Sequence, residues 1–64
     1  TPPEGPQAVV WQAVRTEPTH IDQVAQEAGL PVAEVAALLM ELEIRGLVRQ
    51  VPGKHFIRIE GAAG

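Results

Sequence analysis

The 64-residue sequence has no cysteine, no tyrosine, and only one tryptophan, one phenylalanine and one methionine. Without thiols, the chain can form neither a disulfide framework nor a thiolate metal site. No apolar run approaches the roughly 20 residues of a membrane span, and no signal-peptide pattern is present. We therefore expect a cytoplasmic protein that is held together by packing alone.

Large apolar side chains are also few. Of the 29 apolar residues, nine are alanine, and most of the others are valine, leucine and isoleucine. A chain of this length buries only about 60% of the surface that its unfolded form exposes. These residues suffice for one compact core, but not for a core and a deep substrate pocket, which typically needs about 300 Å³ or more. An enzyme acting alone is thereby disfavoured, and because the chain begins at Thr1 rather than Met we expect a domain cut from a longer protein.

Proline and glycine are concentrated at the two ends of the sequence. Residues 1–6 read TPPEGP and are predicted to be the remnant of an interdomain linker, since this composition cannot continue a helix or a central strand. Residues 61–64 read GAAG and are predicted to be a flexible tail. A single domain is expected over residues 7–60.

The spacing of apolar residues within this domain predicts three helices, over residues 7–15, 20–28 and 32–45. His20 stands at the N-cap position of the second helix, and Gly29 follows that helix as a left-handed stop. Glu17-Pro18 is expected to end the first helix, and Gly46 the third. The core side of the third helix is predicted to comprise Val35, Leu38, Leu39 and Leu42.

A β-hairpin is predicted after the third helix. Residues 47–51 and 54–59 are rich in β-forming residues and flank Pro52-Gly53. A two-residue Pro-Gly turn suits the twist of a hairpin poorly, so a loop of about four residues is expected. A short strand over residues 19–21 is predicted beside the hairpin. The predicted fold is mainly α with a small hairpin, a winged helix-turn-helix of three helices plus a wing.

The charges are unevenly distributed along the chain. Residues 1–44 carry a net charge of −6, and residues 45–64 carry +3. The basic residues of the second segment, with one histidine, are the candidate contacts for a nucleic-acid backbone: Arg45, Arg49, Lys54, His55 and Arg58. Any such binding is expected to be weak. The alternative is a solvated wing that offsets the acidic helices.

The third helix is poorly suited to reading DNA. At 100° per residue, the side opposite its core stripe holds Ala33, Ala37, Met40 and Ile44. Glutamates at 34, 41 and 43 edge this side, which offers no donor for base edges. Each carboxylate near a phosphate costs about 1–4 kcal/mol. The side is either ordinary exposed helix or a docking site for a second copy, another domain of the chain or a different protein.

No grouping of residues indicates catalysis or cofactor binding. His20 and His55 stand 35 residues apart, which is no recognised metal spacing, so neither a metal nor another cofactor is expected. No Ser/His/Asp or Cys/His arrangement is evident, so no catalytic residue is assigned. Phe56 is expected in the core. Trp11 is expected to be partly buried, with a role as an interface anchor as the alternative.

The run HIDQVAQEAGLPVAEVAALLMELEIRGLVRQVPGKHF resembles the C-terminal winged-helix domain of the DNA processing protein DprA, also called Smf. Its more specific parts are AGLPVAEV at the start of the third helix, LLMELEIRGLVRQ at its end, and VPGKHF in the wing. The resemblance covers about residues 8–59, whereas a helix-turn-helix followed by GLV is common to many winged helices.

The resemblance implies a role in natural transformation and recombination. Family members bind incoming single-stranded DNA and help to load RecA, chiefly through a Rossmann-like domain that is not found in this sequence. It therefore implies a non-enzymatic accessory module that contacts the rest of its parent protein, a second copy or RecA. Single-stranded DNA would be bound mainly by the parent. The alternative is the sequence-specific, duplex-binding winged helix of a bacterial transcription regulator, against which the acidic third helix argues.

Overall fold

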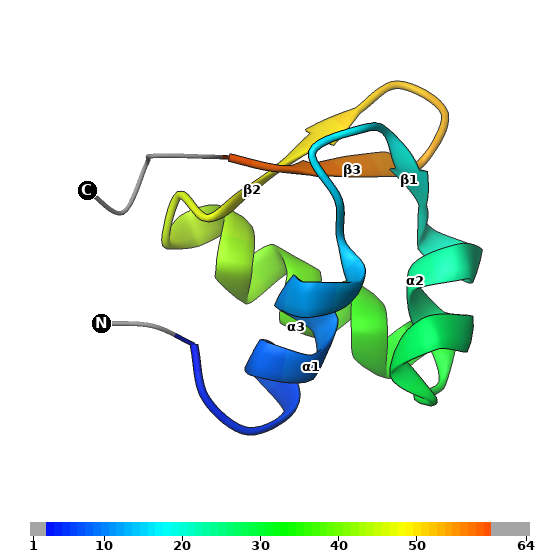
Figure 1. The fold of residues 1–64 in the computed structure, drawn as a ribbon, viewed down its shortest axis with the longest axis vertical. Helices are drawn as coiled ribbons and strands as arrows, with labels where there is room; N and C mark the ends of the chain where they lie inside the picture. The colour runs from blue at the N-terminus through cyan, green and yellow to red at the C-terminus, as the bar shows by residue number, and fades with distance from the viewer. Residues whose placement is uncertain (1–2, 60–64) are drawn as a thin grey trace.

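The computed structural model describes residues 3–59 of the chain. Its elements in order are α1 (Pro6–Ala13), β1 (Thr19–His20), α2 (Ile21–Ala28), α3 (Val32–Ile44), β2 (Val48–Val51) and β3 (His55–Arg58) (Figure 1). The strands form one antiparallel sheet in the order β1-β3-β2. Three helices and a winged hairpin confirm the predicted fold class. The tail predicted over residues 61–64 lies outside the described residues.

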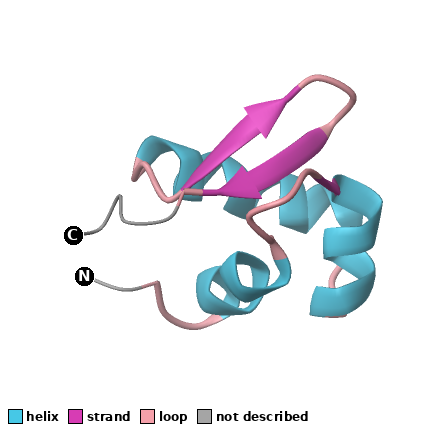
Figure 2. Ribbon diagram, turned by 45° about the horizontal axis from the view of Figure 1, so that its top comes forward, coloured by secondary structure: helices cyan, strands magenta, loops and turns pink. Residues whose placement is uncertain are grey.

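The core lies between the helices and the sheet, which runs along one side of the helical bundle (Figure 2). Helix α3 contributes Val35, Leu39 and Leu42, all completely buried as predicted, whereas Leu38 is only half-buried. The remaining members come from the other elements and the chain that joins them: Val10, Ala13, Val14, Val24, Ala25, Leu47, Val48 and Phe56. Within residues 3–59, no helix has the length and apolar character needed to cross a membrane.

Helix α1 begins and ends earlier than the sequence predicts. It begins at Pro6, inside the segment predicted to be a linker remnant, because proline needs no N–H partner at the first helical position. It ends at Ala13, since Val14 adopts an extended conformation and is buried in the core. The carbonyl of Arg15 then accepts a hydrogen bond of 2.7 Å from the backbone N–H of Arg58. A tertiary contact, rather than the proline at position 18, therefore ends α1.

The start of α2 follows the prediction closely. His20 is the N-cap residue, and its Nδ1 accepts a hydrogen bond of 3.1 Å from the backbone N–H of Asp22. Thr19 and His20 also form the short predicted strand β1, opposite Phe56 and His55 of β3. Gly29 ends the helix in the left-handed conformation, with a φ of 72°. The start of α2 is thereby fixed against the wing.

The wing loop is shorter than predicted. Val51 pairs with His55, which leaves a loop of three residues, 52–54, instead of about four. Both Gly53 and Lys54 have positive φ angles, 87° and 60°. A left-handed residue at the end of a three-residue loop restores the hairpin twist. The loop closes with one residue fewer because Lys54 adopts a conformation that lysine rarely takes.

Candidate interaction surface

The side of α3 that faces away from the core is exposed and apolar. All four residues predicted on this side, Ala33, Ala37, Met40 and Ile44, are exposed. Met40 exposes 64% of its surface and Ile44 exposes 81%. Val32, at the start of the same helix, is 44% exposed. The structure thus leaves an apolar stripe along α3 that no other described part of the chain covers.

Acidic side chains edge this stripe. Glu34 and Glu43 are exposed, and Glu41 Oε1 accepts a hydrogen bond of 2.6 Å from Gln7 Nε2 on α1. Gln7 Oε1 in turn accepts a hydrogen bond of 2.7 Å from Arg45 Nη1. This relay ties the C-terminal end of α3 to α1. Residues 32–44 contain no lysine, arginine, asparagine, glutamine, serine or threonine, so the helix itself offers no side chain that could donate to a base edge.

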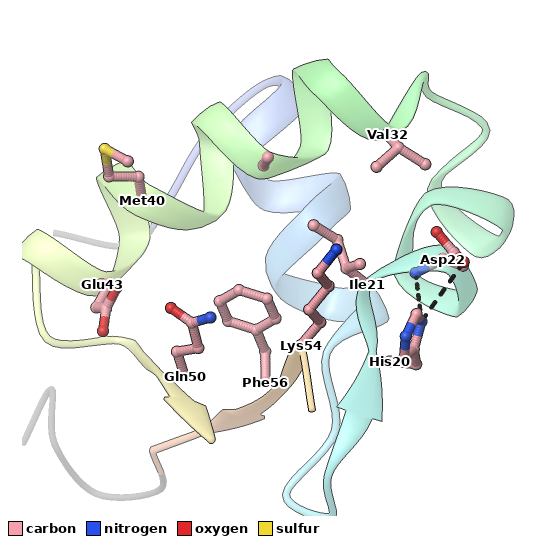
Figure 3. Close-up of a pocket in the computed structure, with 10 residues that line it drawn as sticks. His20, Ile21, Asp22, Val32, Met40, Glu43, Gln50, Lys54 and Phe56 are labelled. Atoms are coloured by element: carbon pink, nitrogen blue, oxygen red, sulfur yellow. Dashed lines mark hydrogen bonds and ion pairs between the residues drawn. The ribbon is translucent and has the colours of Figure 1, made fainter. Parts of the chain in front are cut away.

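A groove with a volume of about 680 Å³ lies between α3 and the wing (Figure 3). Helix α3 forms one wall, and the other wall comprises the start of α2 and the hairpin. The lining residues are Val32, Ala36, Met40 and Glu43 of α3, His20, Ile21 and Asp22 at the start of α2, and Gln50, Lys54 and Phe56 of the hairpin. The sequence predicts too few large apolar residues for both a core and a deep substrate pocket. This groove is of a different kind, because it lies between two surface elements.

The groove and the predicted side of α3 overlap only at Met40. Val32 and Ala36 are one turn apart, and Met40 follows one turn later, so all three project from one edge of the helix. At 100° per residue, Ala36 lies with Glu43 at one margin of the apolar side. The margin that faces the wing depends on where the hairpin packs against α3. Helical periodicity alone does not predict that position.

The candidate basic residues do not form one continuous surface. Arg49 pairs with Ile57 and Arg58 with Val48, so Arg49 and Arg58 project from opposite faces of the sheet. The guanidinium of Arg58 lies 5.2 Å from the centroid of the Trp11 ring, where both residues are half-buried. This contact accounts for the partial burial predicted for Trp11. Arg58 is thus held against α1 rather than displayed on the wing.

The other candidate basic residues lie in three different places. Arg45 caps α3 and reaches Gln7, as described above, whereas Lys54 lines the groove. His55 lies on β3 opposite His20, and the two rings meet edge to face with their centroids 5.2 Å apart. No sequence pattern predicts this contact, because the two histidines are far apart in the chain. Among residues 3–59 no group of three potential metal ligands occurs.

Comparison with known proteins adds an independent finding. A family model described as the DprA winged helix domain matches residues 1–54. Protein Smf of Synechocystis sp. is 43% identical over 49 residues, which cover 77% of this chain and 12% of that protein. Protein Smf of Escherichia coli K12 is 45% identical over 49 residues, 77% of this chain and 13% of that protein. The chain thus spans about an eighth of the length of these curated relatives. No solved structure shows a significant match.

Proposed function

Because this chain belongs to the DprA winged helix domain family, we propose that it is a non-enzymatic interaction module of a longer DprA-like protein. The parent protein binds incoming single-stranded DNA and helps to load RecA in natural transformation and recombination. The domain supports these activities in the cytoplasm by making protein contacts. Its partners are the rest of the parent, including a Rossmann-like domain, and a second copy or RecA.

The exposed side of α3 is the observation that carries this proposal. A winged helix that reads duplex DNA places the corresponding helix in the major groove and needs donors there for phosphates and base edges. Here that helix displays Met40 and Ile44 between glutamates. Covering exposed apolar side chains with a protein partner lowers the free energy of the complex, and methionine adapts to irregular partner surfaces. The surface therefore favours protein docking over DNA reading.

The wing adds at most weak contact with single-stranded DNA in this proposal. Arg49 and Lys54 are exposed and are the two cations best placed for it, because Arg45 and Arg58 contact α1. Two neutralised phosphates give a salt slope of only about −1.4 on a single strand. Phe56, one of two aromatic residues, is buried and does not offer a stacking platform. Contact of this kind would be lost at moderate salt.

An NMR titration of the 64-residue chain at low salt tests the first half of the proposal. Single-stranded and duplex DNA are added in separate series. We expect the amides of residues 32–45 to be unmoved by duplex DNA, because the glutamates repel phosphates. At most, small shifts occur in the wing with the single strand. Shifts in residues 32–45 on adding duplex DNA would reject the proposal and restore the transcription-regulator alternative.

Substitutions on α3 test the second half. Met40→Lys and Ile44→Glu place charges in the exposed stripe, and Val9→Lys is a matched control on α1, where Val9 is 45% exposed. Binding is measured to the remaining part of the parent protein and to RecA, and self-association by sedimentation. We expect the α3 variants to weaken one of these interactions by about tenfold or more and the control to leave it unchanged. Unchanged interactions in folded α3 variants would contradict the docking role.

A further inference from the structure

We propose that the groove between α3 and the wing binds an amphipathic helix of a partner protein, one that carries lysine or arginine near both of its ends. This inference rests on the proposed docking function and names the chemistry of the partner. The groove adjoins the exposed side of α3 that holds Ala33, Ala37 and Ile44 and shares Met40 with it, so it is a second part of the same docking surface.

The groove offers an apolar floor and wall. Phe56 lies at its floor with 7% of its surface exposed, and Ile21 is half-buried beside it. Val32 and Met40 remain 44% and 64% exposed on the α3 wall. Between them stands Ala36, which is small enough for another backbone to come close. An occupant that covers these side chains removes apolar area from water, which stabilises the complex by roughly 25 cal/mol per Å².

The dimensions of the groove suit side chains presented by a helix. The α3 wall runs from Val32 to Glu43, eleven residues along the helix, or about 16 Å. That length corresponds to about three turns of an occupant helix lying alongside α3. A volume of about 680 Å³ accommodates a row of side chains rather than a whole helix. Anchors at i, i+4 and i+7 of an amphipathic helix have the required spacing.

The charges at the two ends of the groove indicate which sign of charge the partner carries near its ends. Asp22 lines the end where Val32 begins α3, and Glu43 lines the opposite end (Figure 3). Both carboxylates are exposed, as is Glu34 on the same helix. An occupant with cations near its ends meets opposite charges there. Lys54 is the one lysine or arginine among the ten lining residues, and it opposes such an occupant.

The same charges argue against the other occupants. A second copy that docked through its own α3 would bring three glutamates toward the glutamates of the first copy. A nucleic acid would bring phosphates toward Asp22 and Glu43. Like charges that approach across an interface suppress such pairings. A cationic helix is the occupant whose charge complements both ends of the groove.

Two synthetic peptides test the inference against the 64-residue chain. Each has about fifteen residues, long enough to form a helix, with leucines at i, i+4 and i+7. One carries lysines near both ends, and its matched control carries glutamates there. Followed by NMR, the lysine peptide is expected to bind about tenfold more tightly than the glutamate peptide. The largest amide shifts are expected at Val32, Ala36, Met40 and Phe56, and added salt should reduce the preference.

Three variants localise the binding. Ala36→Arg blocks the groove, whereas Ala37→Arg places the same side chain at the next exposed position outside it. Only the first is expected to lose the lysine peptide. Lys54→Asn removes the opposing charge and suits the positive φ at that position, so it should tighten binding by about threefold. A gain in affinity of this kind cannot arise from misfolding.

Each contrary outcome rejects a different element of the inference: the charge of the partner, the docking of a helix, the location in the groove or the identity of the occupant. Equal binding of both peptides rejects the charge inference, and binding of neither rejects the helix-docking site. Shifts centred on Ala33, Ala37 and Ile44 reject the groove but leave the proposed docking function standing. Dimerisation that Ala36→Arg abolishes makes a second copy the occupant. If duplex DNA shifts residues 32–45, the proposed function fails as well.

Discussion

His20 belongs to two elements and links them through one side chain. Its backbone ends β1, and its ring nitrogen caps α2 by accepting the N–H of Asp22 at 3.1 Å. A backbone N–H can only donate, so Nδ1 must be the unprotonated acceptor in this arrangement. The same ring packs edge-on against His55 of the wing. One residue therefore orients α2 and the hairpin, the two elements that face α3 across the groove.

We predict that His20→Ala destabilises the fold by about 1 kcal/mol, the usual cost of removing an N-cap side chain. His20→Asn should recover most of this loss, since asparagine supplies a side-chain oxygen to the same backbone N–H. Urea denaturation followed by circular dichroism measures both changes. Equal destabilisation by the two substitutions would show that contact with His55, rather than capping, is what His20 contributes.

The wing depends on a strained loop. Gly53 and Lys54 both occupy the left-handed region, and His55 Nδ1 lies 3.3 Å from the carbonyl oxygen of Pro52. A Cβ added at Gly53 would lie 3.0 Å from His55 Nδ1. At Gly29, by contrast, an added Cβ would meet nothing within 4 Å, so any substitution there changes only the backbone preference. Substituting each glycine by alanine therefore distinguishes the free-energy cost of a left-handed backbone, present at both positions, from the cost of steric crowding, present only at Gly53.

Gly29→Ala should therefore cost about 1 kcal/mol, the penalty for a left-handed alanine. We predict that Gly53→Ala costs more, by about a further 1 kcal/mol, because the ring of His55 must also move. The difference is read from urea denaturation, and NMR shifts of the His20 and His55 rings report the movement. Equal costs with unmoved rings would contradict the steric argument.

The elements differ in how far the sequence predicts them. Helix α3 is predicted to within one residue, because its apolar stripe repeats over three turns and Gly46 follows it. Helix α1 is predicted less well, since it ends at Ala13, two residues before Arg15 bonds to β3 through a contact between residues far apart in the chain. The groove and the distribution of the basic residues depend in the same way on where the hairpin packs. Periodicity identifies what is exposed on α3, but not which exposed edge faces the wing.

At the scale of the whole molecule, the fold is one that many DNA-binding domains share, whereas the charge of its helices disfavours DNA. The architecture is that of a winged helix, a fold whose DNA-reading members place the helix that corresponds to α3 in the major groove. Five acidic residues, however, lie on α2 and α3, and residues 1–44 carry a net charge of −6. The exposed stripe of α3 lies in the middle of this negative region. The chain thus has a fold that many DNA-binding domains share, whereas the acidic and apolar surface of α3 disfavours contact with DNA.

This contrast between the fold and the surface charge of α3 predicts a gain of function. The triple variant Ala33→Arg, Ala37→Arg and Ile44→Lys places three cations on the exposed side of α3 and raises the formal net charge from −3 to 0. All three positions are exposed, so the fold should persist. We expect duplex binding at low salt, with a salt slope of about −3, as three neutralised phosphates require. Fluorescence anisotropy across a salt series measures both quantities.

The matched control replaces the same three residues with glutamine, which supplies hydrogen-bond donors without charge. Binding by the cationic variant but not by the control would place the loss of DNA reading in the side chains of α3 alone. Absence of binding by a folded cationic variant would contradict this view. In that case the positions of α3 and the wing would themselves be unsuited to a duplex, and a frame arranged around the groove for a protein helix would account for both.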